Sequence, residues 1–101
     1  MLHVVHHPAY VSPATDEGQF RFDKYGLVMD ALRESGIAMT IHSPDPMPRD
    51  WIAAVHDPDY VDEVLTLTVP AAKERRIGFP VTDRVMRRAC LSPGGTWAAA
   101  R

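Results

Sequence analysis

The spacing of apolar and polar residues predicts a strand, a helix and a second strand in the first part of the chain. Residues 2–6 form a short apolar run that ends before Pro8, which is typical of a strand. Asp23 suits a helix N-cap, and the apolar residues after it recur three or four positions apart until Gly36, a residue suited to the end of a helix. Residues 38–42 predict the second strand. This order is that of a βαβ unit, whose strands should be parallel and whose crossover should be right-handed.

Short helices are predicted in the middle of the chain. Residues 48–55 predict one helix, and Asp57 followed by Pro58 suits the N-cap and first position of another that runs to Leu65. The residues of the first helix expected to face inward are Trp51, Ile52 and Val55.

The last third of the chain predicts two further helices separated by a break. Residues 73–76 read as a polar turn of helix or a loop. Thr82 suits the N-cap of a helix that stops at the Ser-Pro-Gly-Gly run of residues 92–95. Thr96 then begins a short final helix. Earlier in the chain, residues 8–22 are rich in turn-forming residues and predict a long loop.

These elements predict an α/β fold that resembles the opening of a larger domain. A parallel sheet normally carries helices on both faces, and fewer than three strands rarely form a stable sheet alone. Residues 1–101 are therefore expected to be the N-terminal part of a single domain, with a parallel sheet that ends after two strands and their helices.

Composition indicates a folded protein and excludes some classes of partner. The apolar fraction of 46% and the charged fraction of 24% are those of a globular protein and argue against disorder. A net charge of −2 gives no attraction to nucleic acid or anionic membranes, and no apolar run is long enough to span a bilayer. With Cys90 as its single cysteine, the chain is expected to be cytoplasmic.

Histidines at the ends of the two strands are the first candidates for chemistry. His3, His6 and His7 cluster around the first strand, and His42 ends the second. Ligands of open α/β sheets bind beyond the carboxyl ends of the strands, so a small metal-dependent hydrolase using His6, His7 and His42 is one hypothesis. Hydrogen-bonded histidines at strand ends are the simpler interpretation, because a zinc site needs a third ligand and outer partners.

Two other motifs are explained more simply by structure than by chemistry. His56-Asp57 is similar to the pair used by metal-dependent phosphohydrolases, but Asp57 before a proline is better explained as a helix cap. Residues 92–96 could offer backbone amides to an anion, yet they lack the lysine of a phosphate-binding loop. Close packing of the backbone at the start of a helix is the expected role of this segment.

Taken in order along the chain, five segments resemble the N-terminus of the histone deacetylase superfamily. Of the five segments given next, the second and the fourth look like the class IV branch and its bacterial relatives. The segments are His7-Pro8-Ala9-Tyr10, Phe20-Arg21-Phe22-Asp23-Lys24-Tyr25, His56-Asp57-Pro58-Asp59-Tyr60-Val61, Arg75-Arg76-Ile77-Gly78-Phe79-Pro80 and Ser92-Pro93-Gly94-Gly95-Thr96.

This resemblance implies an arginase/deacetylase-like fold and a zinc-dependent amide hydrolysis. In that family a zinc ion polarises the amide carbonyl and activates water, while paired histidines transfer protons. The substrate would be N-acetyl or N-acyl lysine, or a small acetylated amine. The family's metal ligands and catalytic histidines match no position here, so the isolated chain is expected to bind no zinc and to be inactive.

Two residues receive roles from the resemblance. Lys24 matches a basic residue that lines an internal channel beneath the zinc site, and Phe79 matches a segment at the rim of the substrate pocket. Other branches carry an aspartate near Phe79 that grips the substrate backbone, which favours a small or long-acyl substrate here.

A non-enzymatic alternative also fits the sequence. The chain could be a free-standing interaction module that pairs its open sheet edge with a partner. The same open edge predicts self-association of the isolated chain.

Overall fold

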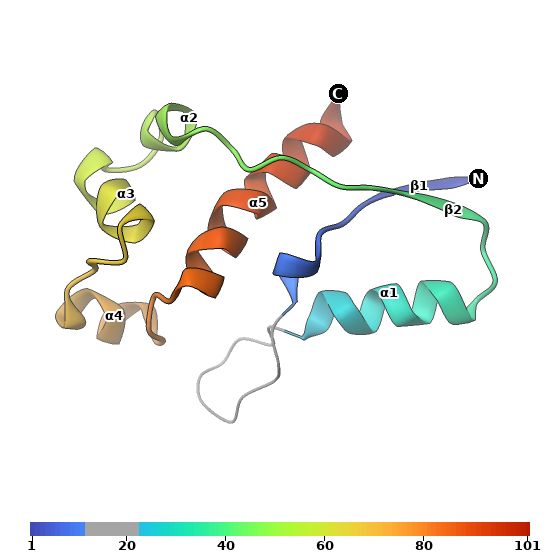
Figure 1. Cartoon of the computed structure of the whole chain (residues 1–101), viewed down its shortest axis with the longest axis horizontal. Helices are drawn as coiled ribbons and strands as arrows, with labels where there is room; N and C mark the ends of the chain where they lie inside the picture. Colours follow the sequence, from blue (N-terminus) through green and yellow to red (C-terminus); the bar gives the residue numbers. More distant parts are fainter. Residues whose placement is uncertain (12–22) are drawn as a thin grey trace.

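A computed structural model describes residues 1–11 and 23–101. It contains a two-stranded sheet and helices of different lengths, and the first helix connects the two strands (Figure 1). In chain order the elements are β1 (Leu2–Val5), the 3-10 helix η1 (Pro8–Tyr10), α1 (Lys24–Glu34), β2 (Met39–His42), α2 (Arg49–Ala53), α3 (Pro58–Leu65), α4 (Ala71–Ile77) and α5 (Asp83–Ala100).

The predicted βαβ unit is confirmed in its order and its parallel pairing. Val5 lies opposite His42, and His3 lies opposite Thr40 in the ladder. Helix α1 begins after Asp23 at its N-cap and ends before Gly36, whose φ of 75° lies in the left-handed region that glycine adopts readily. The handedness of the crossover stays a prediction.

The predicted long loop is interrupted early by η1. Pro8 starts this single turn, and the His7 side chain at its N-cap accepts a hydrogen bond from the backbone N–H of Ala9 at 2.9 Å. The rest of that predicted loop, residues 12–22, lies outside the described residues.

The expected inward face of α2 is wrong for two of its three residues. Trp51 is 53% exposed and Val55 is 78% exposed, while Ile52 is half-buried. A five-residue helix covers too little of its surroundings to bury every apolar side chain. The next helix is as predicted, since Asp57 accepts a hydrogen bond from Asp59 N at 2.9 Å and Pro58 stands at the first position.

The predicted break at residues 92–95 is also wrong, because α5 runs through it without interruption. A proline inside a helix removes one hydrogen bond and costs about 3 kcal/mol. Hydrogen-bond donors from outside the helix reach two backbone carbonyls in the turn before Pro93. Met47 N donates to Cys90 O at 2.9 Å, and the Tyr10 hydroxyl donates to Leu91 O at 2.8 Å.

Two glycines let other parts of the chain approach α5 closely. A Cβ on Gly94 would overlap the carbonyl oxygen of Asp45, and one on Gly95 would overlap the Tyr10 hydroxyl oxygen. The linker between β2 and α2 therefore crosses directly over α5, and η1 packs beside the crossing (Figure 1). The expectation that this glycine run serves close packing is confirmed, but its expected place at the start of a helix is wrong, because the run lies inside α5.

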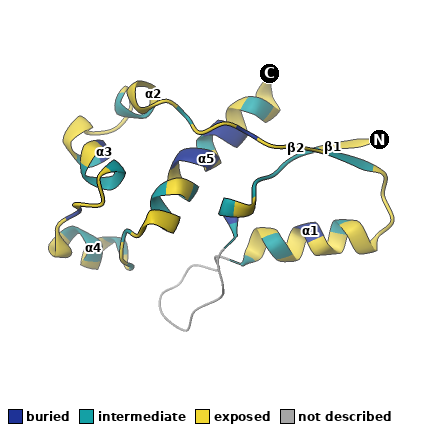
Figure 2. Ribbon diagram, viewed as in Figure 1, coloured by how far each residue is buried: buried dark blue, intermediate teal, exposed yellow. Residues whose placement is uncertain are grey.

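The core is small and follows the middle of α5. Figure 2 shows buried positions concentrated there and exposed positions on most of the other elements. The radius of gyration is 15.2 Å, compared with about 13 Å for a compact domain of 100 residues, and the shortest extent is 16 Å. The buried apolar residues are Tyr10, Met29, Val61, Val69, Cys90 and Leu91.

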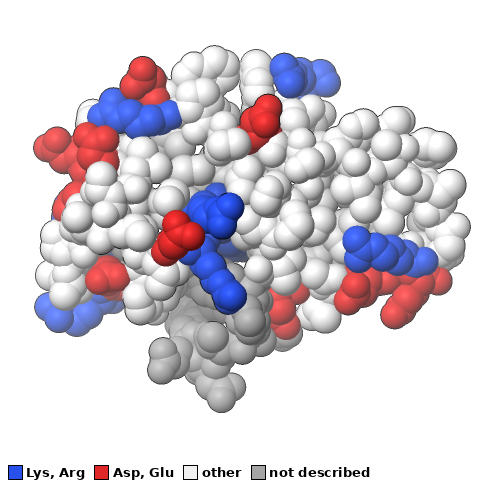
Figure 3. Space-filling view, in the orientation of Figure 1, with Lys and Arg blue, Asp and Glu red and all other residues white. Residues whose placement is uncertain are grey.

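Large apolar side chains remain exposed on several elements. Leu27 of α1 is 54% exposed, Ile41 of β2 is 43% exposed and Trp97 of α5 is 48% exposed. Figure 3 shows charged side chains in separate groups, several of which contain both signs, with uncharged surface between them. The structure is thus a mixed α/β arrangement, mostly helical, whose apolar surface is only partly covered.

Candidate functional site

A pocket of about 320 Å³ lies where β1 ends, between β1, η1, α1 and α5. It combines aliphatic side chains of β1 and α1 with the polar groups of His6, Tyr10 and Tyr25, and with residues from the glycine run of α5. The carboxyl end of a parallel strand is the place where α/β proteins bind ligands. This pocket is the candidate functional site.

His6 is the titratable group at the end of β1. Its ring meets the Tyr10 ring edge-on with centroids 5.7 Å apart. Burial lowers the pKa of His6 below its usual value, and the positive charges of Arg33 and His7 lower it further. The neutral imidazole is therefore favoured. The backbone N–H of His6 donates a hydrogen bond to His42 O at 3.0 Å.

Tyr10 is held rigidly at the side of the pocket. Its hydroxyl donates to Leu91 O, and its ring lies 6.0 Å from the ring of Tyr25. Burial, followed by the proximity of Tyr25, raises the pKa of Tyr10 above its usual value. This phenol is a neutral hydrogen-bond donor and a structural contact to α5.

Lys24 is the first residue of α1 and precedes Tyr25, but it is not among the residues that line this pocket. Its ammonium group is 5.2 Å from the centroid of the Tyr25 ring, and the guanidinium of Arg88 is 5.6 Å from the same centroid. Tyr25 lines the pocket, and the two cations lie near its ring.

Phe79 lies elsewhere, in the loop between α4 and α5. Its side chain is half-buried, and Phe79 is not among the residues that line the pocket with His6. The structure therefore does not bring the two residues of the family resemblance, Lys24 and Phe79, into one pocket among the described residues.

The three histidines of the alternative hydrolase have separate environments. The His7 imidazole caps η1, and the His6 imidazole packs on Tyr10. The imidazole of His42 lies beside His3 instead, with Nδ1 of His3 and Nε2 of His42 3.0 Å apart. Within residues 1–11 and 23–101, no group of three or more His, Cys, Asp or Glu side chains is placed to hold a metal ion.

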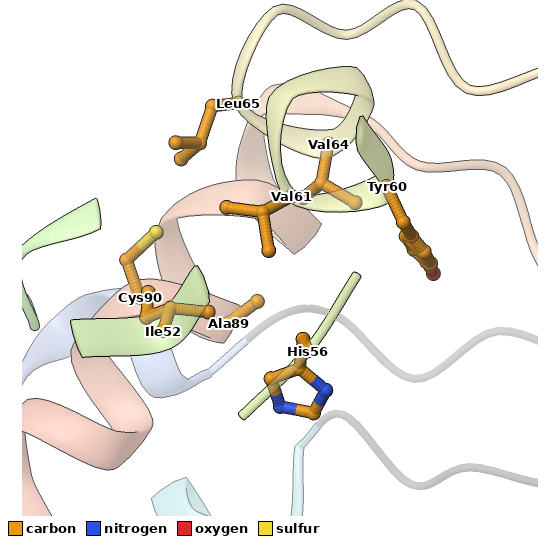
Figure 4. Close-up of a pocket in the computed structure, with 8 residues that line it drawn as sticks. All are labelled: Ile52, His56, Tyr60, Val61, Val64, Leu65, Ala89 and Cys90. Carbon is orange, nitrogen blue, oxygen red and sulfur yellow. The ribbon is translucent and has the colours of Figure 1, made fainter. Parts of the chain in front are cut away.

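A second pocket, of about 290 Å³, separates α2 and α3 from α5. It is mainly apolar, and Figure 4 shows Val61 of α3 pointing toward Ile52, Ala89 and Cys90. Burial raises the pKa of the Cys90 thiol, so this cysteine is a small core residue rather than a reactive thiolate. Because polar groups that could orient a ligand are few here, the first pocket remains the better candidate.

Sequence reasoning missed the pairing of His3 with His42 and the pocket position of Tyr10. Strand alternation could have found the first, since residues on neighbouring parallel strands meet side by side once the register is known. The second depended on contacts between η1 and α5, such as that between Tyr10 and Leu91, which are 81 residues apart in the chain.

No helix among the described residues is long and apolar enough to cross a membrane.

Comparison with known proteins identifies a relative that is itself described as uncharacterized. The chain matches no family model. An uncharacterized protein of Picosynechococcus sp. is 36% identical over 95 residues. The match covers 92% of this chain and 32% of the relative, so the chain spans about a third of the length of the curated relative it matches.

Proposed function

We propose that these 101 residues are the N-terminal part of a zinc-dependent deacetylase domain of the histone deacetylase superfamily, with an arginase/deacetylase-like fold. The reaction would be hydrolysis of the amide bond of N-acetyl or N-acyl lysine, or of a small acetylated amine, in the cytoplasm. The supporting observation is the pocket at the carboxyl end of β1, together with the ammonium group of Lys24, which lies 5.2 Å from the ring centroid of the pocket residue Tyr25. The resemblance assigns a basic residue at that position to a channel through which acetate leaves.

The electrostatics near the pocket are compatible with such a role. The cations of Lys24 and Arg88 lie against the Tyr25 ring, and neutral His6 and Tyr10 offer hydrogen-bonding groups nearby. A carboxylate product would be attracted by the two positive charges. Phe79 remains a residue of the substrate rim in this proposal, on a different part of the surface from Lys24.

The described residues do not fit the family's zinc ion. They hold no cluster of three or more His, Cys, Asp or Glu side chains placed for a metal. In this proposal, two aspartates and a histidine that bind zinc would come from another part of a longer polypeptide. The isolated 101-residue chain should therefore show no zinc-dependent hydrolysis.

Exposed apolar surface and the size of the relative both support a larger domain. Ile41 is 43% exposed on a parallel strand, and both faces of a parallel sheet are normally covered by helices; Leu27 on α1 is 54% exposed as well. The relative is about three times as long as the matched region. Further strands and helices of the same domain would cover these side chains.

The test is an activity assay on the relative of Picosynechococcus sp. and on a chimera that carries this chain in place of the aligned 95 residues. We expect both proteins to release acetate from an acetyl-lysine peptide or an acetylated small amine, and a zinc chelator to abolish the reaction until zinc is restored. In the chimera, Lys24→Ala should slow turnover, whereas Lys73→Ala on α4 should leave it unchanged.

Other outcomes would contradict this proposal. A zinc-loaded relative that hydrolyses no acyl-amine bond, or one that works equally well after chelation, would overturn it. If the isolated chain is a stable monomer that unfolds cooperatively, the non-enzymatic interaction module would become the better explanation.

A further inference from the structure

Two histidines from neighbouring strands come together on one face of the sheet. Successive residues of a strand point to opposite faces, so His3 shares a face with Val5, and His42 shares a face with Thr40. The register places His3 opposite Thr40 and Val5 opposite His42, which makes the two histidines diagonal neighbours. Their ring centroids are 5.2 Å apart, and their planes are tilted by 31°.

The separation of the facing nitrogens suits shared coordination of one cation. Nδ1 of His3 and Nε2 of His42 lie 3.0 Å apart. Metal–imidazole bonds are about 2.05 Å long, and two such bonds spanning 3.0 Å enclose an angle of about 94°. That angle lies near the 90° of octahedral or square-planar sites, and a slight opening of the pair would give the tetrahedral angle.

Both side chains are exposed, so a cation and its remaining water ligands have access. The backbone beneath them is fixed by the parallel ladder, in which Leu2 N donates to Ala38 O at 3.0 Å and His6 N donates to His42 O at 3.0 Å. A chelating pair held on paired strands loses less conformational freedom on binding than two histidines on flexible segments.

We propose that His3 and His42 form a two-imidazole binding site for Zn²⁺ or another late first-row divalent cation. Imidazole nitrogen is a preferred ligand of these metals. On binding, the hydrogen bond between the rings is replaced by two metal–nitrogen bonds. The ring that donates this hydrogen bond releases the proton of its facing nitrogen to water and takes one up on its other nitrogen, so that both neutral rings face the metal with an unprotonated nitrogen. Water fills the other coordination positions.

This site is distinct from the zinc of the proposed deacetylase, rests on no part of that proposal, and departs from the expectation that the isolated chain binds no zinc. It is an open site with two protein ligands and water, in place of the three protein ligands of a catalytic zinc site. It also differs from the alternative set of His6, His7 and His42, because the structure pairs His42 with His3. The neighbouring thioether of Met1, whose sulfur accepts a hydrogen bond from the Thr40 hydroxyl at 3.0 Å, is close to the same face but is not required.

Zinc titration of the 101-residue chain by isothermal calorimetry, in a buffer that does not bind metal, tests the site. We expect one equivalent of Zn²⁺ to bind, and His3→Gln or His42→Gln to weaken binding at least about tenfold, the smaller end of the loss caused by altering an outer-shell partner of a metal site. His56→Gln is the matched control, because His56 is also exposed but lies between α2 and α3; its affinity should equal that of the original chain.

The double variant His3→Gln/His42→Gln should bind little more weakly than either single variant, because one imidazole alone cannot chelate. Far-UV circular dichroism of each variant verifies that the fold persists. If His42→Gln binds zinc as tightly as the original chain, or if the original chain binds no zinc, the site does not exist.

Discussion

At the scale of single residues, small side chains and buried polar groups decide how the chain meets α5. Gly94 and Gly95 could be recognised in the sequence as sites of close packing, but their partners could not. Asp45 and Tyr10 reach them from segments far away in the chain. The same two segments donate hydrogen bonds, from Met47 N and the Tyr10 hydroxyl, to backbone carbonyls in the turn before Pro93.

The steric contact at Gly95 leads to a prediction with an internal control. Gly95→Ala would place a methyl group on the Tyr10 hydroxyl and should lower the free energy of unfolding by about 1–3 kcal/mol. Adding Tyr10→Phe should recover part of this loss, because the next atom of the ring would be 3.3 Å from the new methyl group. Urea denaturation followed by circular dichroism measures both effects.

Gly94→Ala is the matched comparison for this experiment. Its methyl group would meet the backbone oxygen of Asp45, which no side-chain substitution removes. Tyr10→Phe should therefore fail to rescue Gly94→Ala. Equal rescue of both variants would show that Tyr10→Phe acts through something other than the contact at Gly95.

His6 predicts a dependence of stability on pH. Burial, Arg33 and His7 lower its pKa in the folded protein below the value of 6.5 in the unfolded chain. Between these two pKa values the unfolded state binds more protons, so stability falls as the pH decreases below 6.5 and becomes level once the folded pKa is passed.

Urea midpoints measured across this pH range, with His6→Gln as the comparison, test the prediction. The difference in stability between the original chain and His6→Gln should shift against the original chain as the pH falls below 6.5. A difference that stays constant with pH would show that His6 has the same proton affinity in both states.

At the scale of secondary structure, local signals predicted most elements and failed where packing overrode them. Capping residues located the starts of α1 and α3, and short runs that end before prolines located both strands. The break expected in α5 did not occur, because external donors and tight packing stabilise a helix that Pro93 alone would interrupt. Trp51 shows the reverse effect: its ring meets the ring of Trp97 edge-on with centroids 5.5 Å apart, yet both side chains stay about half exposed.

The N-cap of α3 gives a prediction at this scale. Asp57→Ala removes the acceptor of the Asp59 N–H and should destabilise the chain by about 1 kcal/mol. Asp57→Asn keeps an oxygen acceptor and should cost less. Thermal unfolding of the three proteins compares them, and equal losses for alanine and asparagine would indicate that the charge of Asp57, rather than its hydrogen bond, matters.

At the scale of the whole molecule, the small core and the exposed apolar surface are the main features. A 16 Å extent leaves room for little more than one layer of elements on another, and the buried residues gather around the middle of α5. Two strands also leave the outer edges of the sheet open for pairing. The isolated chain should therefore associate with copies of itself.

Sedimentation velocity at increasing protein concentration tests this association. Ile41→Lys places a charge on β2 and should reduce assembly through the sheet. Val55→Lys changes a more exposed apolar residue outside the sheet and should have a smaller effect. If Val55→Lys dissolves the assemblies equally well, association proceeds through general apolar contact instead of the sheet edge.

The sequence by itself determined the local elements whose causes lie within a few residues. These include the βαβ order and the cap at Asp57, both of which the structure confirms. The tertiary structure alone decided the continuity of α5, the exposure of Trp51 and the meeting of His3 with His42. Each of these depends on the free energy of contacts between residues distant in the chain, and local propensity contains no information about which distant partner arrives.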